Sequence, residues 1–227
     1  MENKERYNHL NEYYKNKFGE RTLKICIDAG FTCPNRDGTL SSSGCIFCSE
    51  KGAGELIKFS KLHISEQVNN FLNSYRGMRA NKFIVYFQNF TNTYDSLENL
   101  KEKYDAALVS DKIVGISIAT RPDCITEDIA KLIASYADKY DVSVELGLQT
   151  SNDNIGRIIN RYYTTTQFTT AVNILRKYNI EIITHMMIGL PKESFVDIKD
   201  TVKFINNHDI QGLKIHSTYI VKNTVLA

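Results

Sequence analysis

Apolar, β-branched runs recur along the chain, and stretches with the spacing of amphipathic helices separate them. The runs predict strands at residues 22–29, 82–90, 112–120, 141–149, 180–190 and 213–221. The intervening stretches predict helices near residues 63–78, 96–109, 126–139, 167–178 and 194–207. Ser65, Ser96 and Thr126 stand where N-terminal caps are expected. Strands that alternate with helices in this way indicate a parallel sheet with right-handed crossovers.

The alternation inside the strands favours a barrel over an open doubly wound sheet. In residues 141–149, Ser143, Glu145 and Gln149 share one face, while the other face is apolar. An apolar face packs on helices, whereas a polar face lines a wide lumen, and a full eight-stranded barrel would instead be filled by bulky side chains. We therefore predict an α/β fold, a partial (β/α)6 TIM-type barrel.

We expect one domain over residues 1–227, with an N-terminal extension at residues 1–21. The sequence stops soon after the sixth expected strand, so a C-terminal extension is apparently absent and the chain looks truncated there.

Composition narrows the protein class only modestly. The chain has 227 residues, of which 42% are hydrophobic and 24% charged, as in ordinary globular proteins. Its 28 basic and 26 acidic residues give a net charge of +2, which neither requires nor excludes nucleic acid. The first residues are polar, and no apolar run approaches the ~18 residues needed to span a bilayer. We expect a cytoplasmic protein without membrane association.

Three cysteines follow the first expected strand: Cys33, Cys45 and Cys48, spaced C-x11-C-x2-C. Three thiolates in one loop suit an iron–sulfur cluster with one iron left open for chemistry. Structural zinc is the alternative, because adding Cys26 gives the four thiols that such a site prefers. Cys26 lies inside the first strand and is not obviously close to the loop, so both readings stay open. Cys124 is interpreted as an incidental thiol.

The segment CPNRDGTLSSSGCIFC resembles the cluster loop of radical S-adenosylmethionine (SAM) enzymes. Most of that superfamily has three residues between the first two cysteines. Eleven residues match the branch that contains the catalytic subunit of Elongator and a related bacterial family of small radical SAM proteins. The similarity to the bacterial family covers nearly the whole chain and continues through YFQNFTNTYDS, TRPDC, ELGLQT, INRYYT, HMMIGLP and KIHSTYIVKNTVL.

The resemblance implies that Cys33, Cys45 and Cys48 bind a 4Fe–4S cluster and that SAM is the second cofactor. The SAM-binding residues that it suggests are Phe47, Gln88, Asn89, Thr91, Asn92, Glu145, Gln149, Arg161, His185 and Gly189. Residues 88–93 stand where related enzymes usually carry a Gly-Gly-Glu-like element that binds the methionyl amine. No acidic residue is present there until Asp95, so an Asn/Thr turn that holds its own backbone is the other reading.

Several of these residues have a structural alternative. Arg161 either pairs with the SAM carboxylate or is a solvated helix residue. His185 either contacts cofactor or substrate or is a satisfied core histidine. Arg121 and Asp123 either form a loop ion pair or line the substrate mouth. His185, Arg121 and Asp123 are the candidates for catalysis.

By resemblance, we expect reductive cleavage of SAM to a 5′-deoxyadenosyl radical, with the electron supplied by a flavodoxin- or ferredoxin-type donor. The expected substrate is tRNA, modified on the 5-aminomethyl-type side chain of wobble uridine. Basic and aromatic residues suit RNA or ordinary solvated surface: Lys15, Lys17, Arg21, Tyr7, Tyr13, Tyr14, Lys51, Lys58 and Lys61. The alternatives are a radical SAM enzyme for a small metabolite or peptide, and a zinc-stabilised RNA-binding module.

Overall fold

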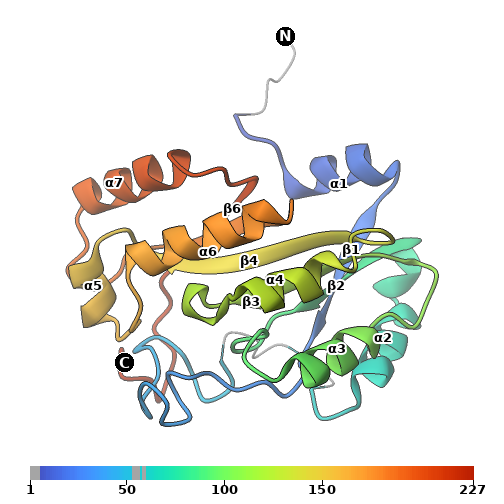
Figure 1. Cartoon of the computed structure of the whole chain (residues 1–227), viewed down its shortest axis with the longest axis horizontal. Coiled ribbons are helices and arrows are strands. Elements are labelled where there is room, and N and C mark those ends of the chain that lie inside the picture. Colours follow the sequence, from blue (N-terminus) through green and yellow to red (C-terminus); the bar gives the residue numbers. More distant parts are fainter. Residues whose placement is uncertain (1–5, 53–56, 58–59) are drawn as a thin grey trace.

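The computed structural model describes residues 6–52, 57 and 60–227. Its sheet has six parallel strands in the order β1-β2-β3-β4-β5-β6, and it curls into a half-barrel (Figure 1). The strands are β1 (Thr22–Ile27), β2 (Lys82–Phe87), β3 (Ile113–Thr120), β4 (Asp141–Gln149), β5 (Glu181–Ile188) and β6 (Gly212–Ser217). The expected partial barrel is confirmed. Its carboxyl-terminal edge collects the ends of all six strands, where α/β proteins place their chemistry.

The helices lie outside the sheet: the first precedes β1, and the others connect successive strands, most of them over the convex face (Figure 1). They are α1 (Leu10–Phe18), α2 (Ile64–Leu72), α3 (Leu97–Asp105), α4 (Glu127–Ala134), α5 (Asp153–Ile158), α6 (Thr165–Lys177) and α7 (Phe195–Asn206), with short 3₁₀ turns η1 (Gly77–Arg79) and η2 (Pro122–Cys124). Within the described residues, no helix is long and apolar enough to cross a membrane.

Helix capping agrees with the sequence at two of three sites. The side chains of Ser96 and Thr126 accept hydrogen bonds from the backbone at the starts of α3 and α4. The prediction for Ser65 is wrong, because the cap of α2 is His63, whose side chain accepts from the Ser65 backbone. Glu66 completes this cap by accepting from the backbone N–H of His63.

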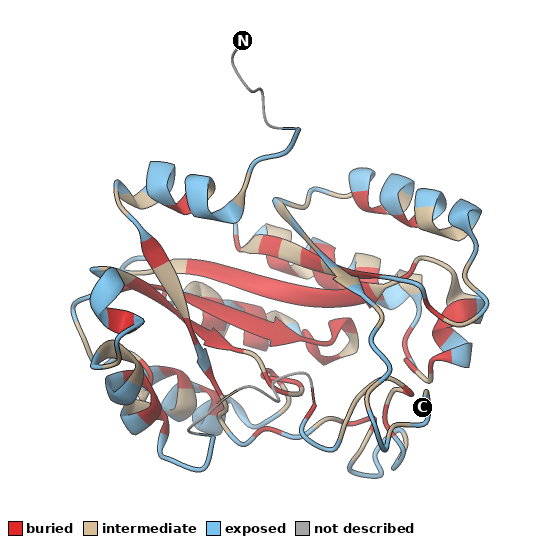
Figure 2. Ribbon diagram, turned by 180° about the vertical axis from the view of Figure 1, so that it is seen from behind, coloured by how far each residue is buried: buried red, intermediate tan, exposed pale blue. Residues whose placement is uncertain are grey.

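The two faces of the sheet differ as the alternation predicted. Ile116, Ile118, Val144 and Leu146 belong to the core between the sheet and the helices and are fully buried. The opposite face turns Ser117, Ser143 and Glu145 into the lumen, where their side chains hydrogen-bond to one another across β3 and β4. Figure 2 shows the buried central strands from the lumen side. The half-barrel therefore has a packed convex face and a polar concave face.

Helix α1 lies at the amino ends of the strands and was not predicted. Lys17 forms ion pairs with Asp141 and Glu181, the first residues of β4 and β5, at 2.6 and 2.8 Å. Tyr13 donates to the same Glu181, and Tyr14 is buried beneath. These residues therefore anchor the helix instead of forming a free RNA-binding surface. Lys58 lies outside the described residues.

Candidate active site

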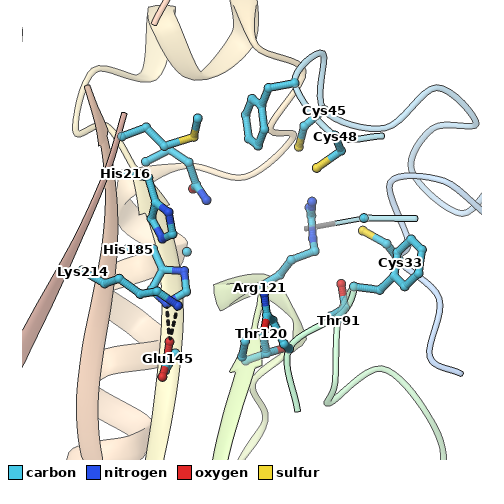
Figure 3. Close-up of a pocket in the computed structure, with 18 of the residues that line it drawn as sticks. Cys33, Cys45, Cys48, Thr91, Thr120, Arg121, Glu145, His185, Lys214 and His216 are labelled. Atoms are coloured by element: carbon cyan, nitrogen blue, oxygen red, sulfur yellow. Dashed lines mark hydrogen bonds and ion pairs between the residues drawn. The ribbon is translucent and has the colours of Figure 1, made fainter. Parts of the chain in front are cut away.

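The three cysteines share one cavity of about 300 Å³ at the carboxyl ends of the strands. Cys33, Cys45 and Cys48 line it from the loop after β1, together with Phe47 (Figure 3). Strand and post-strand residues complete the wall, among them Tyr86, Gln88, Thr91, Arg121, Glu145, Gln149, Tyr163, His185, Lys214 and His216. The sequence placed these residues on separate strands, and the curl of the sheet brings them around one space.

Hydrogen bonds inside the loop and to the turn after α5 hold the cysteines in position. The backbone N–H of Cys48 donates to the carbonyl of Cys45 at 3.0 Å, and that of Ile46 donates to the carbonyl of Ile159. Asn35, which is fully buried, donates from Nδ2 to Cys45 Sγ at 3.4 Å and to the Asn160 carbonyl at 2.6 Å. Asn35 thus ties the thiol loop to the turn after α5.

The environment of Cys45 favours its thiolate form. A hydrogen bond from Cys48 lowers the pKa of Cys45 to about 7, and Arg121 and Asn35 act in the same direction against the effect of burial. The same contact, together with burial, raises the pKa of Cys48 well above its usual range. A pKa of about 7 gives Cys45 a substantial thiolate fraction at neutral pH, and the thiolate is the form that binds metals.

Cys26 does not line this cavity. It is solvent-exposed on β1, beside Tyr86 of β2 in the strand register. In the part of the chain with described coordinates, no group of three or more His, Cys, Asp and Glu side chains is arranged around a single metal-ion position. The fourth thiol of the zinc alternative therefore does not share the cavity of Cys33, Cys45 and Cys48. Cys124 is buried on η2, outside the cavity wall.

The segment after β2 divides into cavity and supporting residues. Gln88 and Thr91 line the cavity. Asn92 is fully buried and donates from Nδ2 to the carbonyls of Phe87 and Ala119, while Asn89 donates to Asp28. Of the four residues assigned to SAM in this segment, two reach the cavity and two hold the turn. The turn interpretation therefore holds for Asn89 and Asn92, whereas SAM binding by Gln88 and Thr91 stays a prediction.

Arg161 lies behind the cavity wall. Its side chain is 1% exposed, so it is not a solvated helix residue. The guanidinium donates to the carbonyls of Leu148, Thr150 and Tyr163 at 2.7, 2.6 and 3.0 Å, and it pairs with Asp153 at 2.6 Å. These bonds join the end of β4 to the turn after α5. This geometry opposes the expected contact with the SAM carboxylate.

Glu145 lies at the centre of a charged cluster in the lumen. Tyr86 donates to Oε2 at 2.9 Å and Ser117 donates to Oε1 at 3.1 Å. Lys24 pairs with Oε1, and Lys214 lies 3.5 Å from Oε2. Burial alone would raise the pKa of Glu145, but His185 and the two lysines outweigh it and hold this pKa well below its usual range. The carboxylate is therefore ionised at neutral pH.

His185 and His216 complete the cluster from β5 and β6 (Figure 3). His185 Nε2 is 2.5 Å from Glu145 Oε2, and the two imidazole rings are 5.2 Å apart between centroids. Burial lowers the pKa of His185 despite the nearby carboxylate. Burial, His185 and Lys214 together lower the pKa of His216 to about 4. Both imidazoles are neutral at pH 7, so His185 donates Nε2–H to Glu145.

Arg121 and Asp123 form an ion pair in the loop, which is one of the two interpretations offered by the sequence. Both carboxylate oxygens of Asp123 accept from the guanidinium, at 3.0 and 2.7 Å. Arg121 also lines the cavity and stacks over the ring of Tyr163 at 4.8 Å, and its side chain points toward the cysteines (Figure 3). Asp123 is not part of the cavity wall. Burial lowers the pKa of Arg121, but Asp123 outweighs burial and the net shift is upward.

Gln149 and Gly189 lie at strand ends, as expected. Gln149 lines the cavity with a positive φ of 62°, and Tyr163 donates to its side-chain oxygen at 2.7 Å. Gly189 also has a positive φ, 86°, but is not part of the cavity wall. Its backbone N–H donates to Glu193 at 2.7 Å. The ring of Phe47 forms part of the wall beside the cysteines.

Sequence reasoning missed Lys24, Tyr86, Tyr163 and Lys214. The strand parity that placed Glu145 in the lumen also places Lys24 and Lys214 there, on β1 and β6. The alternation of side chains could therefore have identified both lysines, had it been followed in the edge strands β1 and β6. Tyr163 follows α5 and has no periodic signal, because its position depends on the turn that Arg161 holds.

The cavity fits a soft-metal cluster beside a polar small molecule. Three sulfur atoms lie on one wall, and sulfur is the ligand that iron–sulfur clusters require. Thr91 lies on the wall too, and its Oγ1 is buried without a hydrogen-bond partner among the residues described here. This hydroxyl is therefore free to accept a hydrogen bond from a molecule bound in the cavity. The aromatic and aliphatic wall, including Phe47 and Met187, suits a ring such as adenine.

A family model described as the Radical SAM superfamily matches residues 31–205. The chain belongs to this superfamily, whose members use a 4Fe–4S cluster and SAM. It is 39% identical over 220 residues to the uncharacterised protein YtqA of Bacillus subtilis, covering 96% of this chain and 68% of YtqA. It is 31% identical over 135 residues to a tRNA uridine(34) acetyltransferase of Dehalococcoides mccartyi, covering 58% of this chain and 28% of that protein.

Solved structures share the fold at low sequence identity. Coproporphyrinogen III oxidase HemN of Escherichia coli, described as a radical SAM enzyme, matches with a TM-score of 0.62 and 15% identity, over 88% of this chain and 44% of HemN. Elp3 of Methanocaldococcus infernus matches with a TM-score of 0.60 and 17% identity, over 90% of this chain and 47% of that chain. The chain thus spans less than half of each of these structures.

Proposed function

We propose that this radical SAM enzyme cleaves SAM reductively at a 4Fe–4S cluster held by Cys33, Cys45 and Cys48, and that it modifies the side chain at carbon 5 of wobble uridine in tRNA. The cavity is the observation that carries the first part, because the three thiols of the C-x11-C-x2-C loop line the same space as residues from β2 to β6. The likeness to the tRNA uridine(34) acetyltransferase supports the second part.

The residues of this chain would bind, orient and enclose the reactants. When bound, the cluster and SAM supply one-electron cleavage of a sulfonium and a radical that takes hydrogen from the substrate. In this proposal Thr91 Oγ1 would accept from the methionyl ammonium and Phe47 would contact the adenine, which their positions on the cavity wall support. Gln149, whose side-chain oxygen accepts from Tyr163, would hydrogen-bond the nucleoside part. A flavodoxin- or ferredoxin-type protein would deliver the electron.

Anaerobic iron–sulfur reconstitution tests the cluster. We expect a brown protein that forms 5′-deoxyadenosine from SAM after reduction, and loss of both properties in Cys45→Ala. Cys26→Ala is the matched control, because the zinc alternative needs this thiol and the cluster does not. A colourless protein that binds one zinc, and loses it in Cys26→Ala, would refute the proposal.

Nucleoside analysis of tRNA tests the substrate. In a strain that lacks the protein, we expect a wobble-uridine nucleoside to be replaced by its unprocessed precursor. Restoring the wild-type chain should restore the nucleoside, whereas Cys45→Ala should not. Unchanged wobble uridines in the deletion strain would contradict the tRNA assignment while leaving SAM cleavage intact, and would favour a small metabolite or peptide as substrate.

A further inference from the structure

The charged cluster around Glu145 has more positive than negative charge. Lys24 and Lys214 both pair with Glu145, which is the one carboxylate they share among the residues that the structure describes, and His185 and His216 are neutral at pH 7. Both ammonium groups also lie over the ring of Tyr86, at 4.6 and 5.0 Å from its centroid. The two cations therefore converge on one carboxylate, which leaves about one positive charge beside the cavity.

Lys214 is the less neutralised of the two lysines. Each ammonium donates to one hydroxyl at 3.2 Å, Lys214 to Tyr86 and Lys24 to Ser117, but Lys214 is 3.5 Å from Glu145 Oε2, while Lys24 makes the closer contact with Oε1. The Lys214 side chain is 39% exposed, against 19% for Lys24. Lys214 lines the cavity, whereas Lys24 is not part of its wall. A ligand in the cavity can therefore contact the excess positive charge at Lys214.

His216 supplies a second, independent observation on the same strand. Its Nε2 is buried and has no hydrogen-bond partner among the residues described for this chain. His216 lies two residues beyond Lys214 on the same face of β6, about 7 Å along the strand, and both line the cavity. In Figure 3 these two residues lie across the cavity from the three cysteines. A buried polar nitrogen beside an under-neutralised ammonium is an incomplete anion site.

We propose that Lys214 and His216 form a subsite for an anionic oxygen group of the substrate, a carboxylate or a phosphate. Lys214 supplies the charge, and His216 donates one hydrogen bond from Nε2–H. The subsite rests on the proposed function only in that the substrate enters this cavity. Glu145 holds Lys214 in place. Because Lys24 and His185 also contact Glu145, the Glu145 carboxylate stays paired when Lys214 is replaced.

The test is a titration of the cluster-loaded protein with sodium acetate and with inorganic phosphate, at constant ionic strength set by sodium chloride. The readout is the NMR signal of ¹³C-labelled His216, assigned by its absence in His216→Gln. We expect a saturable shift with acetate, with phosphate or with both, and the anion that responds identifies the group. Lys214→Met should weaken this binding at least tenfold, the loss expected for one charge-assisted hydrogen bond, and Lys214→Arg by less than threefold.

Lys222→Met is the matched control, because Lys222 is an exposed lysine near the same end of the chain and should leave binding unchanged. Each titration is repeated with SAM present, because the carboxylate of SAM is the competing occupant. A response that SAM abolishes would overturn the proposal, and so would an equal response in Lys214→Met or with chloride alone. Failure of the tRNA assignment would leave this result untouched, because neither probe is a nucleotide.

Discussion

Replacing Arg161 separates a structural role from a SAM-binding role. Arg161→Met removes three buried hydrogen bonds, to the carbonyls of Leu148, Thr150 and Tyr163. Hydrogen bonds from a charged donor contribute more than neutral ones, so at about 1.5 kcal/mol each the loss is about 4.5 kcal/mol. The pair with Asp153, whose side chain is 38% exposed, adds little. Arg161→Lys keeps the charge but not the planar fork, so we expect a loss of about 2–3 kcal/mol.

The assay is urea unfolding followed by circular dichroism on the cluster-loaded protein at pH 7, with SAM affinity measured by equilibrium dialysis. We expect both variants to unfold at lower urea concentration, and the folded fraction to bind SAM within about threefold of wild type, since the side chain does not reach the cavity. A variant with wild-type stability and SAM binding weakened tenfold or more would refute this reasoning and restore Arg161 as a carboxylate ligand.

Three further predictions follow from contacts in the fold. Glu145→Gln should cost about 2–3 kcal/mol at pH 7, below the usual cost of breaking a buried pair because Lys214 is partly solvated. The lowered pKa of Glu145 stabilises the fold above pH 4.5, and this stability is lost as the pH falls toward the folded-state pKa. Glu145→Gln should therefore reduce the loss of unfolding free energy at acid pH, measured by urea titration. An unchanged loss at acid pH would contradict the lowered pKa of Glu145. Gly156→Ala should lower stability by about 1–3 kcal/mol, because its Cβ would lie 2.8 Å from Arg161 Nη2; a melting temperature equal to wild type would show that the guanidinium moves freely. Thr126→Ala should cost about 1 kcal/mol through loss of the α4 cap, measured by thermal unfolding, and Thr126→Ser should restore most of it; no difference between Ala and Ser would count against the cap.

Local signals were sufficient for the strands and for the cysteine loop. The alternation in residues 141–149 predicted both the bounds of β4 and the lumen position of Glu145, because side chains of a strand must alternate between its faces. The spacing of Cys33, Cys45 and Cys48 predicted a shared site, because a short loop keeps its thiols together.

Contacts distant in sequence decided what could not be predicted. Lys24 meets Glu145 across 121 residues, a contact that exists only because the sheet curls. Arg161 was interpreted either as a SAM ligand or as a solvated helix residue, yet it is buried and donates to three carbonyls at the end of β4 and in its own turn. Ser65 was chosen as a cap by residue type, whereas His63 fills that place because its imidazole accepts the same N–H. Tertiary partners thus decided the positions of Lys24 and Arg161, whereas the cap of α2 was decided locally, by a residue two positions before Ser65.

The sequential order of the strands has a consequence for the growing polypeptide. Each strand of the sheet pairs with the one made just before it, so chain emerging from the ribosome always meets an edge already in place. Glu145 then has Lys24 as its counter-ion well before Lys214 is synthesised, and the two charges cancel. The attraction for anions arises only when β6 docks. The order of synthesis therefore delays the excess positive charge beside the cavity until β6 has paired with β5.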